Sequence, residues 1–293
     1  MILEGKIIKG IGGFYYVSTA DGIFSCRARG KFRQESQTPV VGDMAEIEVT
    51  DTQKKEGYVV KIFPRKNALI RPQVSNIDQL LITFAAMSPE PSLHLIDKLT
   101  VTALSKNIPC AICINKADLS EEKSAEYKQI YESAGFTVIV CSAETGENTD
   151  KLKELLKDKT TALAGSSGVG KSSLLNSIGE SFNLKTGNVS DKIQRGKHTT
   201  RHTELFPLSF GGYVLDTPGF GSFDVLDIKH YDLAPLFPEI ERHEGGCRFV
   251  GCAHIKEPDC SVKEALEQGK IHKSRYESYC LLYEQLKQIK DWE

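Results

Sequence analysis

The sequence predicts a multidomain protein with an all-β barrel first, an α/β domain in the centre and a mainly helical, metal-binding module last. Three observations lead to this prediction. Short strand-like runs separated by Gly, Asp and Pro extend to about residue 65, apolar runs alternate with helical stretches from about 70 to 220, and a Cys/His cluster follows. We expect the domain boundaries at 1–66, 67–222 and 223–293.

The composition is that of a globular protein: 293 residues, 40% hydrophobic and 26% charged. A formal net charge of −2 argues against a uniformly basic nucleic-acid binder, so any such surface must be a local patch. The start of the chain has no long apolar core with a cleavage site, and no run of about 18 apolar residues follows. We therefore expect no membrane span and a cytoplasmic protein.

The first domain contains the strand-like runs GGFYYVSTA, GIFSCRARG and DMAEIEV. The run CRARGKFR spaces four basic residues by two, so an extended chain would place them on one face: Arg27, Arg29, Lys31 and Arg33. A small barrel with a basic face resembles an OB-fold that contacts RNA phosphates. The alternative is an ordinary solvated face of the sheet.

The central domain alternates the apolar runs DQLLITFAA, CAICIN, TVIVCSA and TTALAG with helical stretches, which predicts a mainly parallel sheet covered by helices. In the helix predicted after residue 120, Ser120 is placed to cap the N-terminus. Two acidic residues follow in the first turn, and Gly135 suits the C-terminal stop.

A phosphate-binding loop is predicted between the run TTALA and the helical stretch KSSLLNSI. The segment fits Gly-x4-Gly-Lys-Ser/Thr, in which glycines let backbone N–H groups surround phosphates. Lys171 would reach the β- and γ-phosphates, and the Ser172 hydroxyl would bind Mg²⁺. The nucleotide-binding residues expected here are Gly165, Ser166, Ser167, Gly168, Val169, Gly170, Lys171, Ser172 and Ser173.

A base-reading loop is predicted at NKAD, which follows the apolar run CAICI. The Asp118 carboxylate can accept two hydrogen bonds from the N1–H and N2–H₂ of guanine, which adenine cannot offer. Asn115 would join this loop to its neighbours, and the Lys116 stem would lie over the purine. Ser142 and Ala143 end another strand and could complete the pocket. A turn that merely caps the next helix is the alternative.

The segment DTPGF follows the apolar run YVL. Asp216 suits a contact with Mg²⁺, and the Gly219 N–H can meet a γ-phosphate. Alone, this segment would be read as a simple turn.

Together the motifs resemble a GTPase whose order is permuted, since NKAD and Ser-Ala precede GSSGVGKS and DTPG. The arrangement is similar to the ribosome small-subunit-dependent GTPase family of bacteria, over essentially the whole chain. NIDQ at 76–79, GKHTT at 196–200 and the terminal Cys/His cluster belong to the resemblance. One departure is Asn148, where a Gly is more usual, and we expect only a local change there.

The resemblance implies a circularly permuted P-loop GTPase domain that hydrolyses GTP with Mg²⁺ in late maturation of the small ribosomal subunit. Implied partners are GTP or GDP, the small subunit and its rRNA, and we expect a monomer stimulated by the subunit. A non-catalytic RNA-binding scaffold held folded by GTP is the alternative. A P-loop kinase would leave NKAD unexplained.

The segment from Lys185 to Thr203 carries five basic residues against Asp191, a net charge of 5 − 1 = +4 with neutral histidines. Its place is that of switch I, and Phe220 replaces the usual water-orienting Gln. The resemblance supports Thr200 as a ligand of Mg²⁺ and the γ-phosphate, with Thr199 second. It also supports His198 as the catalytic group that orients water, unless that histidine lies in a loop that only contacts RNA.

The third module contains Cys247-x4-Cys252-x-His254-x5-Cys260, a full tetrahedral set for one structural Zn²⁺. His243 competes as a ligand, and the family pattern selects His254. A group of free buried cysteines is the alternative. One or two amphipathic helices broken near Gly269 are expected after the cluster.

Overall fold

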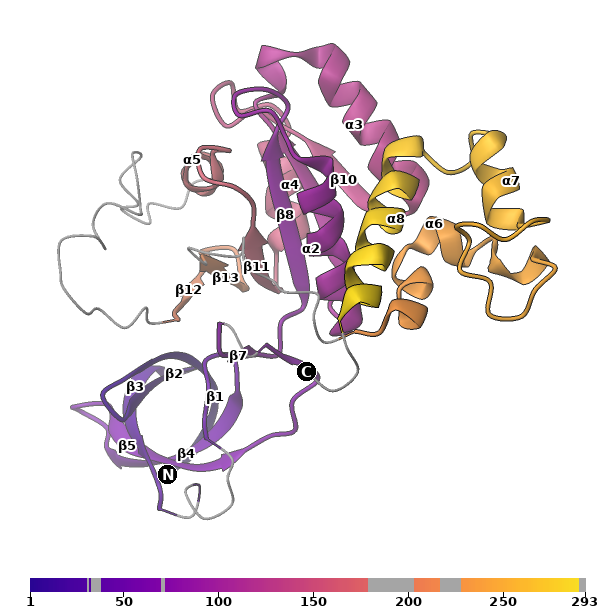
Figure 1. The fold of residues 1–293 in the computed structure, drawn as a ribbon. Helices are drawn as coiled ribbons and strands as arrows, with labels where there is room; N and C mark the ends of the chain where they lie inside the picture. Colours follow the sequence, from indigo (N-terminus) through magenta and orange to yellow (C-terminus); the bar gives the residue numbers. More distant parts are fainter. Residues whose placement is uncertain (31, 33–37, 70–71, 179–202, 217–227, 290–293) are drawn as a thin grey trace. The chain divides into compact units, whose positions relative to one another are not determined.

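The computed structural model describes residues 1–30, 32, 38–69, 72–178, 203–216 and 228–289 (Figure 1). The described chain forms two compact units. The first contains the described residues of 1–79, 156–163 and 203–216, and the second contains 80–155, 164–178 and 228–289.

Five strands close the N-terminal barrel in the order β1-β2-β3-β5-β4 (Figure 1). Every neighbouring pair is antiparallel except β3 and β5, which run parallel. This arrangement confirms the predicted OB-like barrel. The strands are β1 (Ile2–Ile11), β2 (Phe14–Thr19), β3 (Gly22–Ala28), β4 (Met44–Asp51) and β5 (Glu56–Ile62). Its core consists of Ile7, Val17, Phe24, Cys26, Phe32, Ala45, Ile47 and Val59.

The run from Cys26 to Arg33 is not one extended strand, because β3 ends at Ala28. A turn follows, in which the Phe32 N–H donates to the Arg29 carbonyl oxygen at 3.2 Å, and the Phe32 side chain joins the barrel core. Arg27 and Arg29 are exposed, whereas Lys31 and Arg33 lie outside the described residues.

The remaining strands, except the short pair β6 (Ala68–Leu69) and β7 (Val74–Ser75), follow the order β10-β9-β8 in the second unit and β11-β13-β12 in the first. In the second unit β8 (Gln79–Ala85), β9 (Cys110–Asn115) and β10 (Thr137–Val140) pair in parallel. In the first unit β11 (Thr160–Ala164) and β13 (Tyr213–Asp216) pair in parallel, and β12 (Leu205–Pro207) is antiparallel to β13. The mainly parallel arrangement agrees with the prediction.

Within the first unit, polar contacts join the barrel to β11, β12 and β13. The Lys6 ammonium donates to the Thr160 hydroxyl and lies 5.1 Å from the centre of the Tyr213 ring. Lys9 forms an ion pair with Glu204 at 2.8 Å. These contacts fix the barrel against these strands through partly buried, directional bonds.

The helices of the central region are α2 (Leu93–Ser105), α3 (Glu121–Ala134), α4 (Thr149–Leu156) and α5 (Lys171–Ser177). The predicted capping of α3 is confirmed. The Ser120 hydroxyl accepts a hydrogen bond from the Lys123 N–H at 3.3 Å, and Gly135 ends the helix with φ of 104°.

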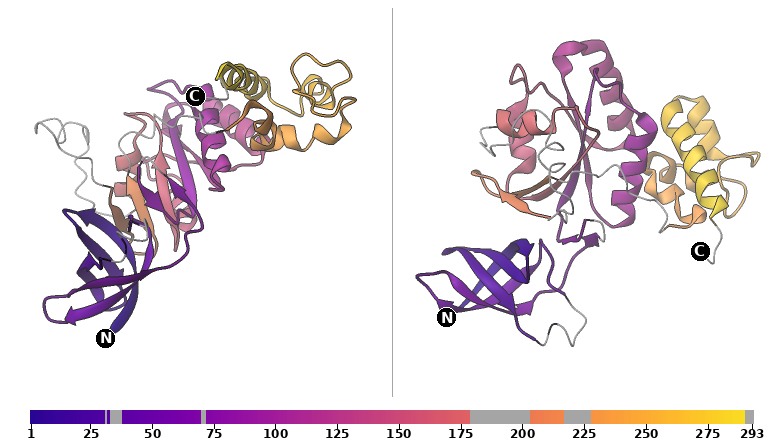
Figure 2. Two further views of the ribbon diagram at one scale, coloured as in Figure 1. Left: turned by 60° about the horizontal axis from the view of Figure 1, so that its bottom comes forward. Right: turned by 60° about the vertical axis from the view of Figure 1, so that its left-hand side comes forward.

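The C-terminal region folds on α2 and α3 in the second unit, as Figures 1 and 2 show. Gly269, with φ of 70°, separates its last two helices as predicted. Its core includes Val101 of α2. The elements are the 3-10 turns at His230–Asp232, Ala234–Leu236 and Glu244–Gly246, and the helices α6 (Pro238–Glu241), α7 (Ser261–Glu267) and α8 (Lys273–Gln288). No helix in the described ranges has the length and apolar character that crossing a membrane requires.

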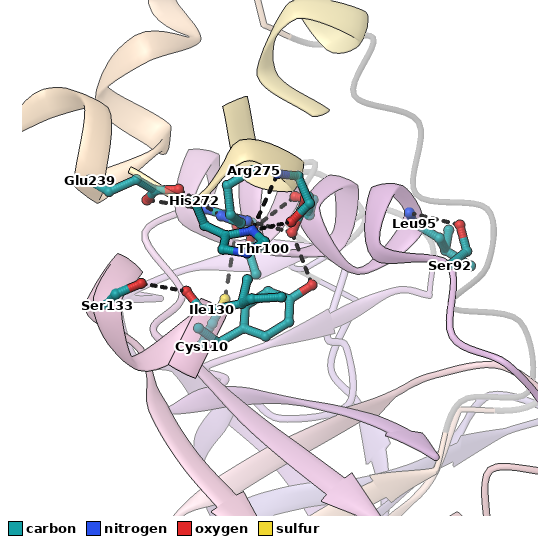
Figure 3. A network of polar contacts seen from close by, with 12 residues as sticks. Ser92, Leu95, Thr100, Cys110, Ile130, Ser133, Glu239, His272 and Arg275 are labelled. Atoms are coloured by element: carbon teal, nitrogen blue, oxygen red, sulfur yellow. Dashed lines mark hydrogen bonds and ion pairs between the residues drawn. The ribbon is translucent and has the colours of Figure 1, made fainter. Parts of the chain in front are cut away.

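A buried ionic network holds α8 and α6 to α2 (Figure 3). Arg275 is 1% exposed and donates to the Glu239 carboxylate at 2.6 and 3.3 Å and to Asp97 at 2.6 Å. The Tyr131 hydroxyl donates to the same Asp97 oxygen at 3.1 Å. Burial lowers the pKa of Arg275, but the charges of Asp97 and Glu239 raise it by more. Arg275 therefore neutralises two buried acids at the junction.

Replacing this guanidinium in Arg275→Met should destabilise the contact between α8 and α2 by about 3–5 kcal/mol, because Asp97 and Glu239 would remain buried without a cation. Native-state hydrogen exchange of α8 amides measures the change. Lys273→Met is the control, since Lys273 is exposed on α8 and its ammonium forms a surface ion pair with Glu277 at 3.7 Å. Equal protection in both variants would contradict the assigned role.

Candidate functional site

The phosphate-loop motif forms a strand–loop–helix unit, with β11 before residues 165–170 and α5 after them. Gly165, Gly168 and Gly170 have φ of 141°, 80° and 90°. Such angles suit glycine and let successive N–H groups turn toward one side. The motif therefore has the backbone that phosphate binding requires.

Two of these glycines are also required by close packing within the second unit. A Cβ on Gly165 would lie 2.0 Å from the Thr83 carbonyl oxygen, and one on Gly170 would lie 2.3 Å from Asn115 Nδ2. The loop is thus held against the ends of β8 and β9, and larger residues would push it away.

The outer part of the loop is open, since Ser166, Ser167 and Gly168 are exposed while Val169 is buried. Lys171 begins α5 and donates to the Gly165 and Ser166 carbonyl oxygens at 2.7 and 2.9 Å. Its ammonium thus lies across the loop. Ser172 and Ser173 follow in the first turn of α5 and are partly buried.

Asn115 joins the predicted base loop to the phosphate loop. Its side chain is buried at the end of β9, where Nδ2 donates to the Val169 carbonyl oxygen at 2.8 Å. Its Oδ1 accepts from the Ala143 N–H at 3.1 Å. One amide therefore fixes three loops that are distant in sequence, and each of its bonds is buried or partly buried.

The other base-loop residues lie beside it. Asp118 is exposed in the short 3-10 helix Ala117–Leu119, and its carboxylate accepts from the buried Ser142 hydroxyl. The Ser142 hydroxyl in turn accepts from the Thr145 N–H at 3.2 Å. An oriented, solvent-facing carboxylate can accept two parallel N–H groups from a base edge.

Sequence reasoning missed Ser88, whose carbonyl oxygen accepts from the Lys116 ammonium. Lys116 has a left-handed backbone with φ of 58°, and this bond orients its side chain. A backbone carbonyl has no residue-type signal, so only the fold could reveal it. At Asn148, where the family more usually has a Gly, the backbone takes a φ of 53°, and the side chain donates to the Val140 carbonyl oxygen at 2.9 Å.

The predicted switch residues are only partly described. Asp216 is the last residue of β13, and its backbone pairs with Leu163, two positions before Gly165 in the chain. The Asp216 side chain, Gly219, His198 and Thr200 lie outside the described residues.

The predicted metal ligands come together in the second unit. The ligand atoms of Cys247, Cys252, His254 and Cys260 all lie within 4.8 Å of one another. The Cys247 and Cys260 sulfurs are 3.8 Å apart, and His254 Nδ1 is 3.5 and 3.4 Å from them. Metal–ligand bonds of about 2.3 Å to sulfur and 2.0–2.1 Å to nitrogen give tetrahedral edges of roughly 3.8 and 3.6 Å. The donor set therefore fits a closed tetrahedral metal site.

Groups around the cluster hold the ligands in place. His254 Nε2 lies 3.3 Å from a Glu244 carboxylate oxygen, the kind of partner that orients a metal-bound imidazole. From α8, Tyr276 donates to the His254 carbonyl oxygen at 2.6 Å and Tyr279 to that of Ala253 at 2.9 Å. The ligand turn is thus tied to the longest helix of the region.

The base loop and phosphate loop meet as in P-loop GTPases, but the base loop comes first in the chain, which defines a circularly permuted GTPase domain. The family model for the RsgA GTPase matches residues 62–226, and that for the RsgA N-terminal domain matches residues 4–59. The chain belongs to the RsgA GTPase family.

Individual relatives agree with this assignment. A protein of Agathobacter rectalis named small ribosomal subunit biogenesis GTPase RsgA is 48% identical over 97% of this chain and 98% of its own length. The crystal structure of YjeQ from Thermotoga maritima superposes with a TM-score of 0.86 at 35% identity, covering 99% of this chain and 100% of that one. YloQ, described as a circularly permuted GTPase, has a TM-score of 0.82 at 36% identity, over 100% and 98% of the two chains.

Proposed function

We propose that this protein hydrolyses GTP in late maturation of the small ribosomal subunit, binds rRNA and is stimulated by the subunit. The observation that carries the proposal is the Asn115 side chain, which bonds to both Val169 and Ala143. These two bonds hold residues 115, 143 and 169 together, which supports one nucleotide site made from the phosphate loop and the base loop. The name of the Agathobacter rectalis relative supports the small subunit as partner.

In this site each loop has its own task. Lys171 and the loop N–H groups hold the phosphates, while Asp118, Lys116 and the 142–143 turn hold the guanine. Mg²⁺ would be held by Ser172, Thr200 and Asp216 and would neutralise phosphate charge. His198 orients the attacking water, and the Gly219 N–H meets the γ-phosphate. The further binding residues proposed are Asn115, Ser142, Ala143, Gly165, Ser166, Ser167, Gly168, Val169, Gly170 and Ser173.

The metal proposed for the cluster is one structural Zn²⁺, because three thiolates and one imidazole are the ligands it prefers and they close the coordination sphere. We retain the domain division 1–66, 67–222 and 223–293. The protein acts as a monomer, and it works in the cytoplasm, where the small subunit is found. Its RNA contacts are confined to local basic patches because the net charge is only −2.

The test is a turnover assay with GTP or ATP, with and without purified small subunits. We expect GTP hydrolysis that is slow alone and at least about tenfold faster with subunits, since rRNA phosphates would contact the basic segment from Lys185 to Thr203. ATP should not be hydrolysed. Lys171→Ala is the control for contaminating activity. The scaffold alternative predicts RNA binding with negligible turnover even on the subunit, and that result would overturn the proposal.

A further inference from the structure

A row of three outward-facing side chains crosses three neighbouring strands of the barrel. The strand register places Phe14 of β2 opposite Arg27 of β3, and Arg27 opposite Tyr58 of β5. Neighbouring strands are about 4.8 Å apart, so the row extends roughly 10 Å across the surface. The residues are far apart in sequence, and only the order β2-β3-β5 makes them neighbours.

The row is both aromatic and exposed. Phe14 and Tyr58 have exposed fractions of 37% and 43%, and Arg27 is exposed between them. The Arg27 guanidinium carbon lies 4.6 Å from the centre of the Phe14 ring. A planar cation beside an aromatic ring is favourable by itself and leaves both available to a further flat group.

Charge distinguishes Arg27 from the basic residues around it. Arg29 is paired with Glu48, Lys61 lies 3.3 Å from Glu46, and Lys9 is paired with Glu204. In the described part of the chain, no carboxylate lies within ion-pair distance of Arg27. Glu48 stands opposite Tyr58 in β4, where Arg29 neutralises it. The row therefore keeps a net positive charge.

We propose that Phe14, Arg27 and Tyr58 form a stacking site for unpaired bases of single-stranded RNA. The inference rests on the proposed function, which supplies RNA as the partner, and it names the form of RNA. Aromatic faces and guanidinium planes stack on nucleobases, and only unpaired bases offer their faces. A surface that bound phosphates alone would need several unpaired cations, whereas the described residues Lys9, Arg29 and Lys61 are each paired with a carboxylate.

The test measures fluorescence anisotropy of the full-length, GDP-bound protein with a labelled oligoadenylate about ten nucleotides long and with an RNA duplex of equal length. Phe14→Ala and Tyr58→Ala should each weaken binding of the single strand roughly 5- to 150-fold and leave duplex binding unchanged. Both side chains are exposed, so these variants should fold.

Three further variants separate stacking from charge and from misfolding. Tyr58→Phe should retain affinity because the ring remains. Arg27→Lys keeps the charge but loses the plane, so it should also weaken binding. Arg29→Lys makes the same change at a neighbouring exposed arginine outside the row. It keeps a cation beside Glu48 and should bind as wild type.

The proposal is overturned if the wild-type protein does not bind the single strand, if Arg27→Lys binds as wild type, or if single-strand and duplex binding fall together. It is also overturned if the row variants lose binding to the small subunit but keep their affinity for oligoadenylate, because the row would then contact a protein. Subunit-stimulated hydrolysis is assayed in parallel. If the wild-type protein binds oligoadenylate but its GTP hydrolysis is not stimulated by the subunit, the proposed function alone is refuted. If hydrolysis is stimulated but Phe14→Ala and Tyr58→Ala bind oligoadenylate as wild type, the stacking site alone is refuted.

Discussion

Asp118→Asn should exchange the base preference of the protein from guanine to xanthine. Xanthine carries an oxygen at C2 where guanine carries an amino group. With xanthine, an amide at position 118 can accept from N1–H through its oxygen and donate to the C2 oxygen through its NH₂. With guanine, the same NH₂ meets the amino group at C2, and two donors then face each other. Sites built on such bonds reject the wrong ligand by factors of about 10⁴–10⁵, so we expect a fall in GTP affinity of at least about 100-fold.

The Asp118→Asn substitution should leave the conformation of the loop unchanged. An amide oxygen at position 118 can still accept from the Ser142 hydroxyl, so the loop should keep its shape. Titration with fluorescent GDP and xanthosine diphosphate measures both affinities. Asp150→Asn, on an exposed residue of α4, is the matched control and should keep the guanine preference. If Asp118→Asn still binds GDP more tightly than xanthosine diphosphate, NKAD is not the base loop.

Cys260→Ser should abolish metal binding by the cluster and unfold the region from 228 to 289. Cys260 is buried, and its sulfur lies 3.8 Å from that of Cys247 and 3.4 Å from His254 Nδ1. Structural zinc sites contribute about 10–16 kcal/mol in small zinc-finger domains, and this region is small. Loss of one thiolate should therefore lower the metal content below half an ion per chain and remove most amide protection there.

The metal content per chain is measured by inductively coupled plasma mass spectrometry, and amide protection is measured by hydrogen exchange. The matched control is Cys280→Ser, because Cys280 is a partly buried cysteine of α8 outside the cluster. It should keep one metal ion. The barrel should stay protected in both variants, since its core is separate. Full metal content in Cys260→Ser would exclude the cluster as a metal site.

Elements with local signals could be predicted from sequence. The helix α3 is the clearest case, because its cap at Ser120, its acidic first turn and its stop at Gly135 are all adjacent residues. The strand β1 was not predicted. Its register shifts between Ile7 and Lys9, so Ile7 and Ile8 are both buried and the period of two is lost. The strand β5 pairs in parallel with β3, a distant contact without a local signal.

The candidate site divides in the same way. The phosphate loop and the ligand spacing of the cluster are contiguous patterns, and their chemistry follows from residue type. The support for the base loop comes from elsewhere: Val169 is 54 positions from Asn115, and Ser88 is 28 positions from Lys116. In both bonds the acceptor is a backbone carbonyl oxygen, of Val169 or of Ser88. Because every residue type carries a backbone carbonyl, the sequence gives no signal for either bond.

The sequence by itself determined which chemical groups this protein carries: a glycine-rich loop of the phosphate-binding pattern, a carboxylate after a strand, and three thiols and one imidazole at metal-ligand spacing. These follow from residue type and short spacing, because backbone dihedrals and ligand preferences act over a few residues. Only the tertiary structure decided which groups meet. Strand register made Phe14, Arg27 and Tyr58 one row, and packing brought Arg275 to two acids from different helices, because such contacts depend on burial and pairing across the whole fold.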